Sequence, residues 1–336
     1  MERYSPSRMS QKLLGSCLII GFGNMGQRYA KLLTNLCPNL SIYVLTKNPS
    51  HSQSIEFSHI NFIAHLDQLH CLIPKFCIIC TPSSQHLLDL LSVSKYSIPV
   101  LIEKPICSGS QMDFELLRTK LIDYDWNNTV VAYLLRHSIA ATQIQNIIRE
   151  KTLGTLIDAQ FYCGSWLPDW RNGSSFLNSI SAKPETGGGV LLELSHEIDF
   201  AIYVLGQMSL SYGCICSDVV FNLRVEEQST IILKTKNNRS CIISLNFCSQ
   251  PSCRQYSIRF SKGQISWDLV NRRFLVTSFD DTPIVSICTE TIADLFLQQL
   301  KSFLSFVYCC DRSPCLCSFS QSMDVVSLIN EVKSFS

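Results

Sequence analysis

The chain has 336 residues, of which 46% are hydrophobic and only 16% are charged. This composition excludes a disordered chain, which would be too polar to offset its conformational entropy. Lys and Arg total 28 against 27 for Asp and Glu, so the basic surface that binds nucleic acid is not expected. The length predicts two domains, and the balanced charge points to a small molecule as the partner.

Membrane insertion and export are not expected from the apolar pattern. The longest apolar runs, at residues 17–20 and 130–135, suit strands and fall short of the roughly 20 residues that cross a bilayer. Residues 1–11 are polar and lack the apolar segment of a secretory signal. We therefore expect a cytoplasmic protein, with no membrane partner, whose 17 cysteines are reduced thiols.

Two cysteine patterns raise the question of a metal site. Cys77 and Cys80 form a CxxC pair, but their odd spacing on an expected strand points the two side chains to opposite faces of the sheet. Residues 309–317 contain a further cysteine cluster, which has no histidine beside it and no paired CxxC spacing. We expect a thiol-rich loop there and no bound metal.

The order of expected elements predicts an α/β fold. Up to about residue 133, apolar strands alternate with helical patterns, which is typical of a doubly wound parallel sheet. The strands are expected at residues 17–20, 41–45, 61–63, 76–80, 100–103 and 129–133. We place the first domain at residues 12–135.

The second domain is expected at residues 136–334, with a largely antiparallel open sheet and last helices that are able to pack back on the first domain. Its strands are expected at residues 156–162, 229–235, 240–247 and 255–260. Its helices are expected at residues 139–149, 189–205, 292–308 and 321–333.

A glycine motif joins the first strand to an amphipathic helix. It consists of Gly21, Phe22, Gly23, Asn24, Met25 and Gly26. Gly21 permits a tight turn, Gly23 lets the backbone approach a pyrophosphate, and Gly26 allows close packing of helix on strand. An ordinary glycine turn is the alternative, but the placement between strand and helix favours a dinucleotide-binding loop.

The cofactor preference is expected to depend on the end of the second strand. An acid at this position would accept hydrogen bonds from a free 2'-hydroxyl of the ribose, whereas this chain has Thr46, Lys47 and Asn48. A lysine with a hydroxyl group suits a 2'-phosphate, so we favour NADP over NAD. The alternative is that Lys47 is an ordinary solvated lysine.

Further motifs follow in an order that carries a resemblance to a known family. They are Thr81-Pro82-Ser83-Ser84-Gln85-His86 after the fourth strand, Glu103-Lys104-Pro105 after the fifth, and Gly187-Gly188-Gly189 leading to His196 and Asp199. Together with the glycine loop they resemble the family of glucose-fructose oxidoreductase, inositol 2-dehydrogenase and the rhizopine-catabolism oxidoreductases (Gfo/Idh/MocA).

The resemblance implies a Rossmann domain followed by a substrate-binding α/β domain. In the family the open sheet of the second domain often forms the oligomer interface, which implies a homodimer or homotetramer. The loops after the fourth and fifth strands are expected to contact the cofactor, beside the glycine loop and the second strand. These further contacts are Thr81, Pro82, His86, Glu103 and Lys104.

The resemblance also implies hydride transfer between the nicotinamide and a carbinol of a sugar, nucleotide sugar or polyol. This reaction needs a group that takes or gives the hydroxyl proton. Lys104 and His196 occupy the positions of the family's lysine and histidine. Taken singly, a surface lysine and a core histidine are the alternatives.

Two acids are candidates for orienting the imidazole. Glu193, His196 and Asp199 are spaced by three, which places them on one face of the expected helix. Many family members carry the acid four residues before the histidine, where this chain has Leu192. The alternative for Glu193 is therefore a structural role near the start of the helix.

The substrate is expected to meet Trp170, Arg171 and Lys183, with ordinary loop packing as the alternative. Related sequences usually carry an acid and tyrosines where this chain has Ser175, Phe176 and Ile180. We expect an NAD(P)-dependent dehydrogenase or reductase acting on CH–OH groups. Two other functions stay open: a non-catalytic nicotinamide-binding sensor or assembly protein, and a glycoside-cleaving relative that uses bound NAD transiently.

Overall fold

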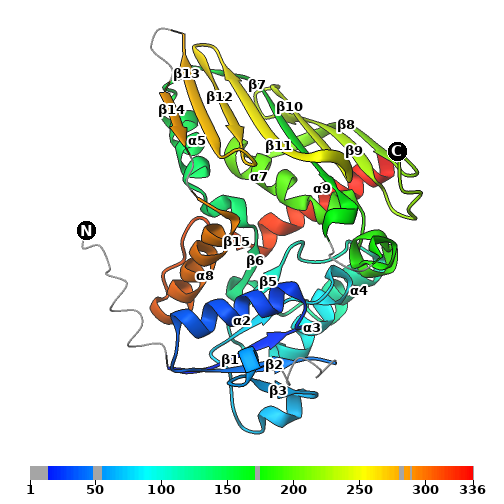
Figure 1. Cartoon of the computed structure of the whole chain (residues 1–336), viewed down its shortest axis with the longest axis vertical. Helices are drawn as coiled ribbons and strands as arrows, with labels where there is room; N and C mark the ends of the chain where they lie inside the picture. The colour runs from blue at the N-terminus through cyan, green and yellow to red at the C-terminus, as the bar shows by residue number, and fades with distance from the viewer. Residues whose placement is uncertain (1–13, 48–54, 171–174, 280–283, 288–289, 336) are drawn as a thin grey trace. The chain divides into compact units, whose positions relative to one another are not determined.

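The computed structural model describes residues 14–47, 55–170, 175–279, 284–287 and 290–335 (Figure 1). The chain divides into two compact units. Unit 1 consists of the described part of Met1–Ala132 together with Leu300–Phe319, and unit 2 consists of the described part of Tyr133–Gln299 together with Ser320–Ser336. The glycine motif and Lys104 belong to unit 1, and His196 belongs to unit 2.

Unit 1 is built on a seven-stranded sheet with the order β15-β6-β5-β4-β1-β2-β3. Its strands are β1 (Gly15–Ile20), β2 (Leu40–Leu45), β3 (Asn61–Ile63), β4 (Phe76–Ile79), β5 (Val100–Glu103), β6 (Thr129–Ala132) and β15 (Cys317–Ser318). All neighbours are parallel except β15, which runs antiparallel to β6. The expected parallel sheet is confirmed, and its winding reverses between β1 and β4, where such sheets bind ligands at their carboxyl ends.

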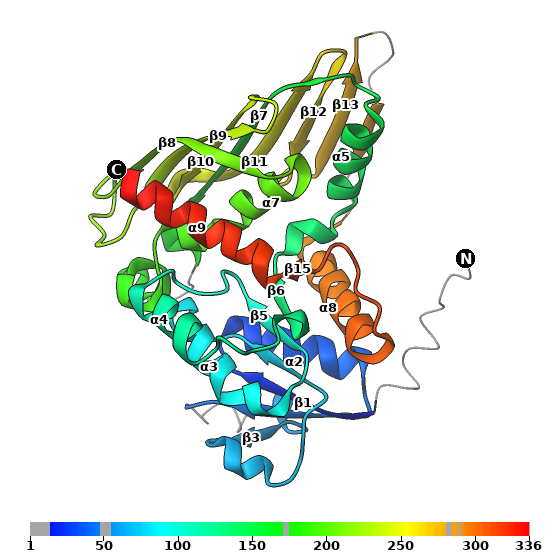
Figure 2. The ribbon, with the colours of Figure 1, turned by 180° about the vertical axis from the view of Figure 1, so that it is seen from behind.

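Helices cover both faces of this sheet, so the expected doubly wound fold is confirmed. Helix α2 (Asn24–Leu36) lies on one face, and α3 (His86–Val93) and α4 (Gln111–Thr119) lie on the other (Figures 1 and 2). In α8 (Ile292–Cys309), Phe303 packs edge-on against Phe76 of β4, with 5.6 Å between the ring centroids. Short 3-10 helices in this unit are η2 (Ile55–Phe57), η3 (Leu66–Leu69), η4 (Ser83–Gln85), η5 (Ser94–Tyr96) and η6 (Trp126–Asn128).

Unit 2 contains an eight-stranded sheet with the order β14-β13-β12-β11-β7-β10-β9-β8. Its strands are β7 (Leu156–Trp166), β8 (Met208–Cys216), β9 (Gln228–Thr235), β10 (Ser240–Asn246), β11 (Cys248–Phe260), β12 (Gly263–Asp268), β13 (Arg273–Ser278) and β14 (Ile284–Ile287). Only β7 and β10 pair in parallel, which confirms the expected, largely antiparallel sheet. Strands β7 and β11 are longer than expected because they pair with each other along an extended, bulged ladder.

The helices of unit 2 gather on one face of its sheet. They include α5 (Ile139–Glu150), α7 (Ser195–Leu205) and α9 (Phe319–Phe335) (Figure 2). The remaining short helices are α6 (Val190–Glu193), η7 (Leu134–His137), η8 (Leu167–Trp170), η9 (Phe176–Asn178), η10 (Ile180–Ala182) and η11 (Pro184–Thr186). Alternation along the strands turns Phe161 and Tyr256 toward α7, where both rings pack near Phe200.

A buried ion pair fixes α7 within unit 2. The guanidinium of Arg136, in η7, donates to Asp199 of α7 at 2.6 Å from Nη2 and 2.9 Å from Nε. Its Nη1 donates to the Gln321 side chain of α9 at 2.9 Å, and Tyr203 lies 4.7 Å away as a cation–π partner. Both charged side chains are 1% exposed, so each depends on the other for compensation.

Replacing Arg136 with Met tests how much this pair stabilises unit 2. We expect Arg136→Met to lower the free energy of unfolding by about 3–5 kcal/mol, because Asp199 keeps a buried charge without its cation. Unfolding by denaturant is measured by tryptophan fluorescence. This signal reports mainly on unit 2, which holds three of the four tryptophans. Arg259→Met is the matched control, since Arg259 is half exposed in its pair with Asp158. Equal losses in the two variants would contradict this account.

Candidate functional site

The glycine loop places the start of α2 directly against the end of β1. A Cβ atom on Gly26 would collide with the carbonyl oxygen of Gly21. Gly21 itself has a φ of 89°, and a Cβ there would lie 3.0 Å from the Cys80 backbone. At Gly23, the N-cap of α2, a Cβ would instead meet no atom within 4 Å. The loop therefore brings helix and strand together while leaving open space at the helix N-terminus, where anions bind.

The side chains of the loop divide between packing and solvent. Phe22 is buried, and its ring packs edge-on against Phe57 and Phe62 with centroid distances of 5.0 Å. Only the backbone of Phe22 is therefore left for a cofactor, and its carbonyl accepts a hydrogen bond from Gln27 Nε2. Asn24 is exposed and Met25 is half-buried at the start of the helix.

His86 ties the loops after β4 and β5 together. Its Nε2 lies 2.8 Å from the Thr81 carbonyl oxygen, and its Nδ1 lies 2.8 Å from the Pro105 carbonyl oxygen. The side chain is 1% exposed, and burial is the main cause that lowers its pKa. His86 therefore fixes the loops from within, whereas Thr81 and Pro82 are half-buried at the surface of the same turn.

The loop that carries Lys104 is joined to the glycine-loop helix by one hydrogen bond. Tyr29 of α2 donates from its hydroxyl to Glu103 Oε1 at 3.0 Å. The other oxygen of Glu103 accepts from the Lys104 backbone at 3.3 Å. Burial raises the pKa of Glu103, although Lys104 and Tyr29 partly offset that effect. Lys104 is half-buried next to this anchored carboxylate, at the carboxyl end of β5.

Thr46 and Lys47 follow β2, at the same edge of the sheet. The Thr46 backbone N–H donates to the Ile63 carbonyl at 3.2 Å, which fixes the turn, and the Lys47 side chain is exposed. Burial raises the pKa of Asp89, and the Lys47 charge partly offsets that rise, so the two charges interact. Asp89 also accepts a 2.5 Å hydrogen bond from Thr81.

In unit 2 the expected helix at residues 189–205 is wrong in one respect, because it is broken at Leu194. Helix α6 ends at Glu193 and α7 begins at Ser195, with Leu194 at φ −100° and ψ 20° between them. The Leu194 side chain is buried, so packing compensates for the lost helical geometry. Glu193, His196 and Asp199 therefore do not share one continuous helix.

The two acids expected to orient the imidazole have other partners. Glu193 Oε1 accepts a 2.7 Å hydrogen bond from the Ser181 hydroxyl. Asp199 is held by Arg136, and its pKa is raised by burial, with Arg136 acting against the rise. Both carboxylates thus have structural contacts of their own within unit 2.

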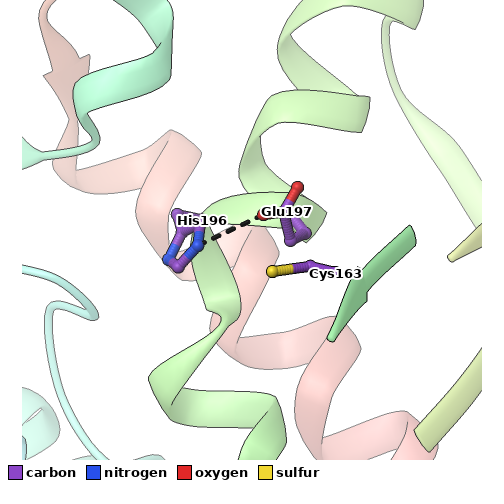
Figure 3. A group of neighbouring side chains, drawn as sticks. All are labelled: Cys163, His196 and Glu197. Carbon is purple, nitrogen blue, oxygen red and sulfur yellow. Dashed lines mark ion pairs between the residues drawn. The ribbon is translucent and has the colours of Figure 1, made fainter. Parts of the chain in front are cut away.

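The acid beside His196 in the structure is Glu197. His196 Nε2 lies 3.2 Å from Glu197 Oε1 (Figure 3). Arg254 Nε lies 2.6 Å from the same oxygen. Glu197 is fully buried, whereas the His196 side chain is 19% exposed. Strand alternation explains the site, because Arg254 and Tyr256 of β11 face α7, and Arg254 is the register partner of Cys163 on β7.

Electrostatics keep Glu197 charged. Burial alone would raise the pKa of Glu197, but Arg254 and His196 outweigh that effect and hold the pKa at about 2. The neighbouring groups shift the other way: burial is the main cause that raises the pKa of Cys163 and of Tyr256. The cluster is therefore one carboxylate and one guanidinium surrounded by neutral groups and the imidazole.

The sequence contains a signal for Glu197 that the spacing argument missed. Glu197 is a charged residue in a largely buried helix and is followed by the buried Ile198, so a buried charge there requires a cation as its partner. Arg254 is the corresponding charge among the inward-facing positions of β11, in phase with Tyr256 and Ile258. Neither position can be matched to the other without the sheet register.

The expected substrate residues are only partly described. The Trp170 indole donates to the Ser165 hydroxyl at 3.2 Å, and its ring packs edge-on against Phe247 at 5.3 Å. Lys183 is half-buried, and its carbonyl accepts from the Gly188 backbone at 2.9 Å. Arg171 and Asn48 lie outside the described residues.

One group of metal-ligand type occurs in the described part of the chain. It consists of Cys163, His196 and Glu197, whose ligand atoms lie within 4.8 Å of one another (Figure 3). The cysteines at residues 309–317 form no such group among the residues with described positions. No described helix is both long and apolar enough to cross a membrane.

Comparisons with known proteins place both units in one family. Residues 16–120 match the model of an oxidoreductase family with an NAD-binding Rossmann fold, and residues 141–266 match the GFO/IDH/MocA C-terminal domain. No curated protein sequence matches the chain.

Solved structures share the fold over nearly the whole chain. Levoglucosan dehydrogenase in complex with NADH and levoglucosan has a TM-score of 0.78 at 15% identity, over 95% of this chain and 96% of the other. A putative NADPH-dependent oxidoreductase from Desulfitobacterium hafniense has a TM-score of 0.78 at 13% identity, over 96% and 95%. UDP-N-acetylglucosamine 3-dehydrogenase from Acidithiobacillus ferrooxidans has a TM-score of 0.74 at 13% identity, over 96% and 97%. With both of its domain models matched in order, the chain belongs to the GFO/IDH/MocA family of oxidoreductases.

Proposed function

We propose that the protein is an NADP-dependent dehydrogenase or reductase that acts on a CH–OH group of a carbohydrate derivative. The observation that carries this proposal is the Tyr29–Glu103 hydrogen bond. It joins the helix of the glycine loop to the loop of Lys104, so a dinucleotide-binding element and a candidate proton carrier share one edge of the sheet.

The residues of unit 1 fit a dinucleotide. Open space at Gly23 and the N-terminus of α2 suit a pyrophosphate, with the backbone of residues 21–26 as its cradle. Thr81 and Pro82 would border the cofactor after β4, and Glu103 and Lys104 would do so after β5. When bound, the nicotinamide accepts or supplies the hydride.

The proton that accompanies the hydride requires a separate carrier. We assign it to Lys104 and His196, whose amine and imidazole nitrogens are groups that can give and take a proton at an alcohol oxygen. Trp170, Lys183 and Arg171 are proposed to contact the substrate.

The substrate class is proposed from the relatives and from the site. Structural relatives are named for a sugar anhydride and for a nucleotide sugar, and one is complexed with L-sorbose. We place this protein's substrate in the same class of sugars and nucleotide sugars. We also propose a cytoplasmic homodimer or homotetramer, joined through the face of the unit 2 sheet that carries Gln160 and Tyr162, opposite the helices.

A panel of keto sugars and nucleotide keto sugars tests the proposal directly. Purified protein should oxidise NADPH with at least one member of the panel. The reaction is measured by the loss of absorbance of the reduced nicotinamide. Tight retention of the cofactor with no net turnover on any member would favour the glycoside-cleaving alternative. Binding of the cofactor without any chemistry would favour a sensor or assembly role.

Lys47 and Thr46 are expected to select NADP over NAD, because an ammonium and a hydroxyl group favour a 2'-phosphate. Lys47→Asp should shift the ratio of the two binding constants toward NAD, as measured by calorimetric titration of both cofactors. Lys75→Asp is the matched control: Lys75 is also exposed, but it precedes β4 and so lies at the opposite edge of the sheet. Tighter binding of NAD than NADP by the parent protein would refute the preference.

Lys104 and His196 are expected to act on one proton. Lys104→Met and His196→Ala should each lower turnover by about 100-fold to 10,000-fold while cofactor affinity changes little. The double variant should be little slower than the slower single variant, since both changes remove the same transfer. Turnover at the parental rate in either single variant would remove that residue from the mechanism.

A further inference from the structure

We propose that Glu197 is a positioning residue for His196: its carboxylate, fixed by Arg254, holds the imidazole with a proton on Nε2 and so makes Nδ1 the basic nitrogen. This inference rests on the proposed role of His196 in proton transfer. It assigns to Glu197 the orienting task that the sequence pattern suggested for Glu193 or Asp199.

The first support is the geometry around one carboxylate oxygen. Glu197 Oε1 lies 3.2 Å from His196 Nε2 and 2.6 Å from Arg254 Nε. Glu197 is fully buried and Arg254 is 15% exposed, so neither can turn to water without moving the packed strands and helix. Arg254 Nε donates its hydrogen bond to the Tyr256 hydroxyl at 2.8 Å, so the carboxylate is held beside Arg254 and the imidazole by charge attraction and packing.

The second support is the charge of the described groups that face the carboxylate. Arg254 and Tyr256 approach from β11, Cys163 approaches from β7, and His196 shares α7 with Glu197. The pKa of Glu197 is held at about 2, whereas those of Cys163 and Tyr256 are raised, chiefly by burial. Glu197 is therefore the anion of the cluster at neutral pH.

The charge of Glu197 decides which nitrogen of the neutral imidazole carries the proton. The negative charge of Glu197, 3.2 Å from Nε2, disfavours a lone pair on that nitrogen and so favours a proton there, although neither carboxylate oxygen has a partner in hydrogen-bond geometry among the described residues. In the neutral imidazole the other nitrogen, Nδ1, then holds the lone pair. Glu197 also stabilises the imidazolium that forms after proton uptake, and Arg254 on the same oxygen limits that stabilisation.

The same three side chains raise a metal site as the rival explanation. Cys163, His196 and Glu197 are all metal ligands by type, and zinc is often bound by such sets. However, Arg254 already pairs with the Glu197 oxygen that faces His196, which places a positive charge beside the position of the ion. The raised pKa of Cys163 also favours the thiol over the thiolate that a metal requires.

The experiment compares four proteins: the parent, Glu197→Gln, Arg254→Met and the double variant. Glu197→Gln alone leaves a buried guanidinium unpaired and is expected to lose stability. The double variant removes both charges, so its stability should recover toward that of the parent. If the ion pair is purely structural, the double variant should recover activity together with stability. If Glu197 positions His196, the double variant should recover stability without activity.

Two readouts follow the imidazole itself. Nitrogen-15 NMR, with the His196 signals assigned from their loss in His196→Ala, should show the Nε2-protonated tautomer in the parent and a mixture of tautomers in the folded double variant. The same variant should lose about 10-fold to 100-fold in kcat with little change in KM. Cys163→Ala is the control and should keep both the parental tautomer and the parental turnover.

Several results would overturn the inference. Parental turnover and an unchanged tautomer in the folded double variant would reduce the cluster to a structural ion pair. Zinc retained by the parent but lost in Cys163→Ala would make the three side chains a metal site. A failure of the proposed role of His196 is recognised separately, because His196→Ala would then turn over at the parental rate while the tautomer result still stood; a failure of the proposed function would leave the parent itself without turnover.

Discussion

The close approach of α2 to β1 at Gly26 is the constraint on which the cofactor edge of unit 1 depends. A side chain at this position would collide with the Gly21 carbonyl oxygen. Because glycine has none, the helix can begin directly at the end of the strand. That placement aims the helix N-terminus at the open space near Gly23, and it brings Tyr29 within hydrogen-bond distance of Glu103. The glycine turn, the helix and the Lys104 loop are thus parts of one arrangement.

In unit 2, buried charges on α7 hold this helix in place. Glu197 and Asp199 are two positions apart, so they point about 200° apart around the helix, toward different neighbours. Asp199 meets Arg136 from η7, and Glu197 meets Arg254 from β11. Each acid pairs with its own arginine, and His196 lies on the first turn of the same helix, beside Glu197.

Much of the fold could be predicted from the sequence because its signals are local. The strands of unit 1 are short apolar runs bounded by turns, and two of them, at residues 61–63 and 100–103, have the expected bounds. The glycine loop was predictable for the same reason, since strand, turn and helix are adjacent in the chain. The break at Leu194 was not, because it is compensated by burial of the Leu194 side chain, which depends on the packing of the whole unit.

The candidate site shows the same limit. His196 stood out through a motif, but its carboxylate neighbour in the structure follows it directly in the chain, and helical spacing had directed attention to residues three positions away. The importance of Glu197 appears only when the register of β7 and β11 brings Arg254 to the same helix. Long-range ion pairs of this kind leave no periodicity in the sequence, although a buried charge on an apolar face indicates that a partner exists.

The central claim, that the loop at residues 21–26 holds a nicotinamide dinucleotide, is tested most directly by titrating NADPH into the parent protein and into Gly23→Val in a calorimeter. A side chain at Gly23 has room beside its Cβ in the protein alone, so the variant should fold with an unchanged melting temperature. It should nevertheless lose NADPH binding, because the added atoms occupy the space that the pyrophosphate requires. Undiminished affinity in the folded variant would contradict the assignment of this loop and the function built on it.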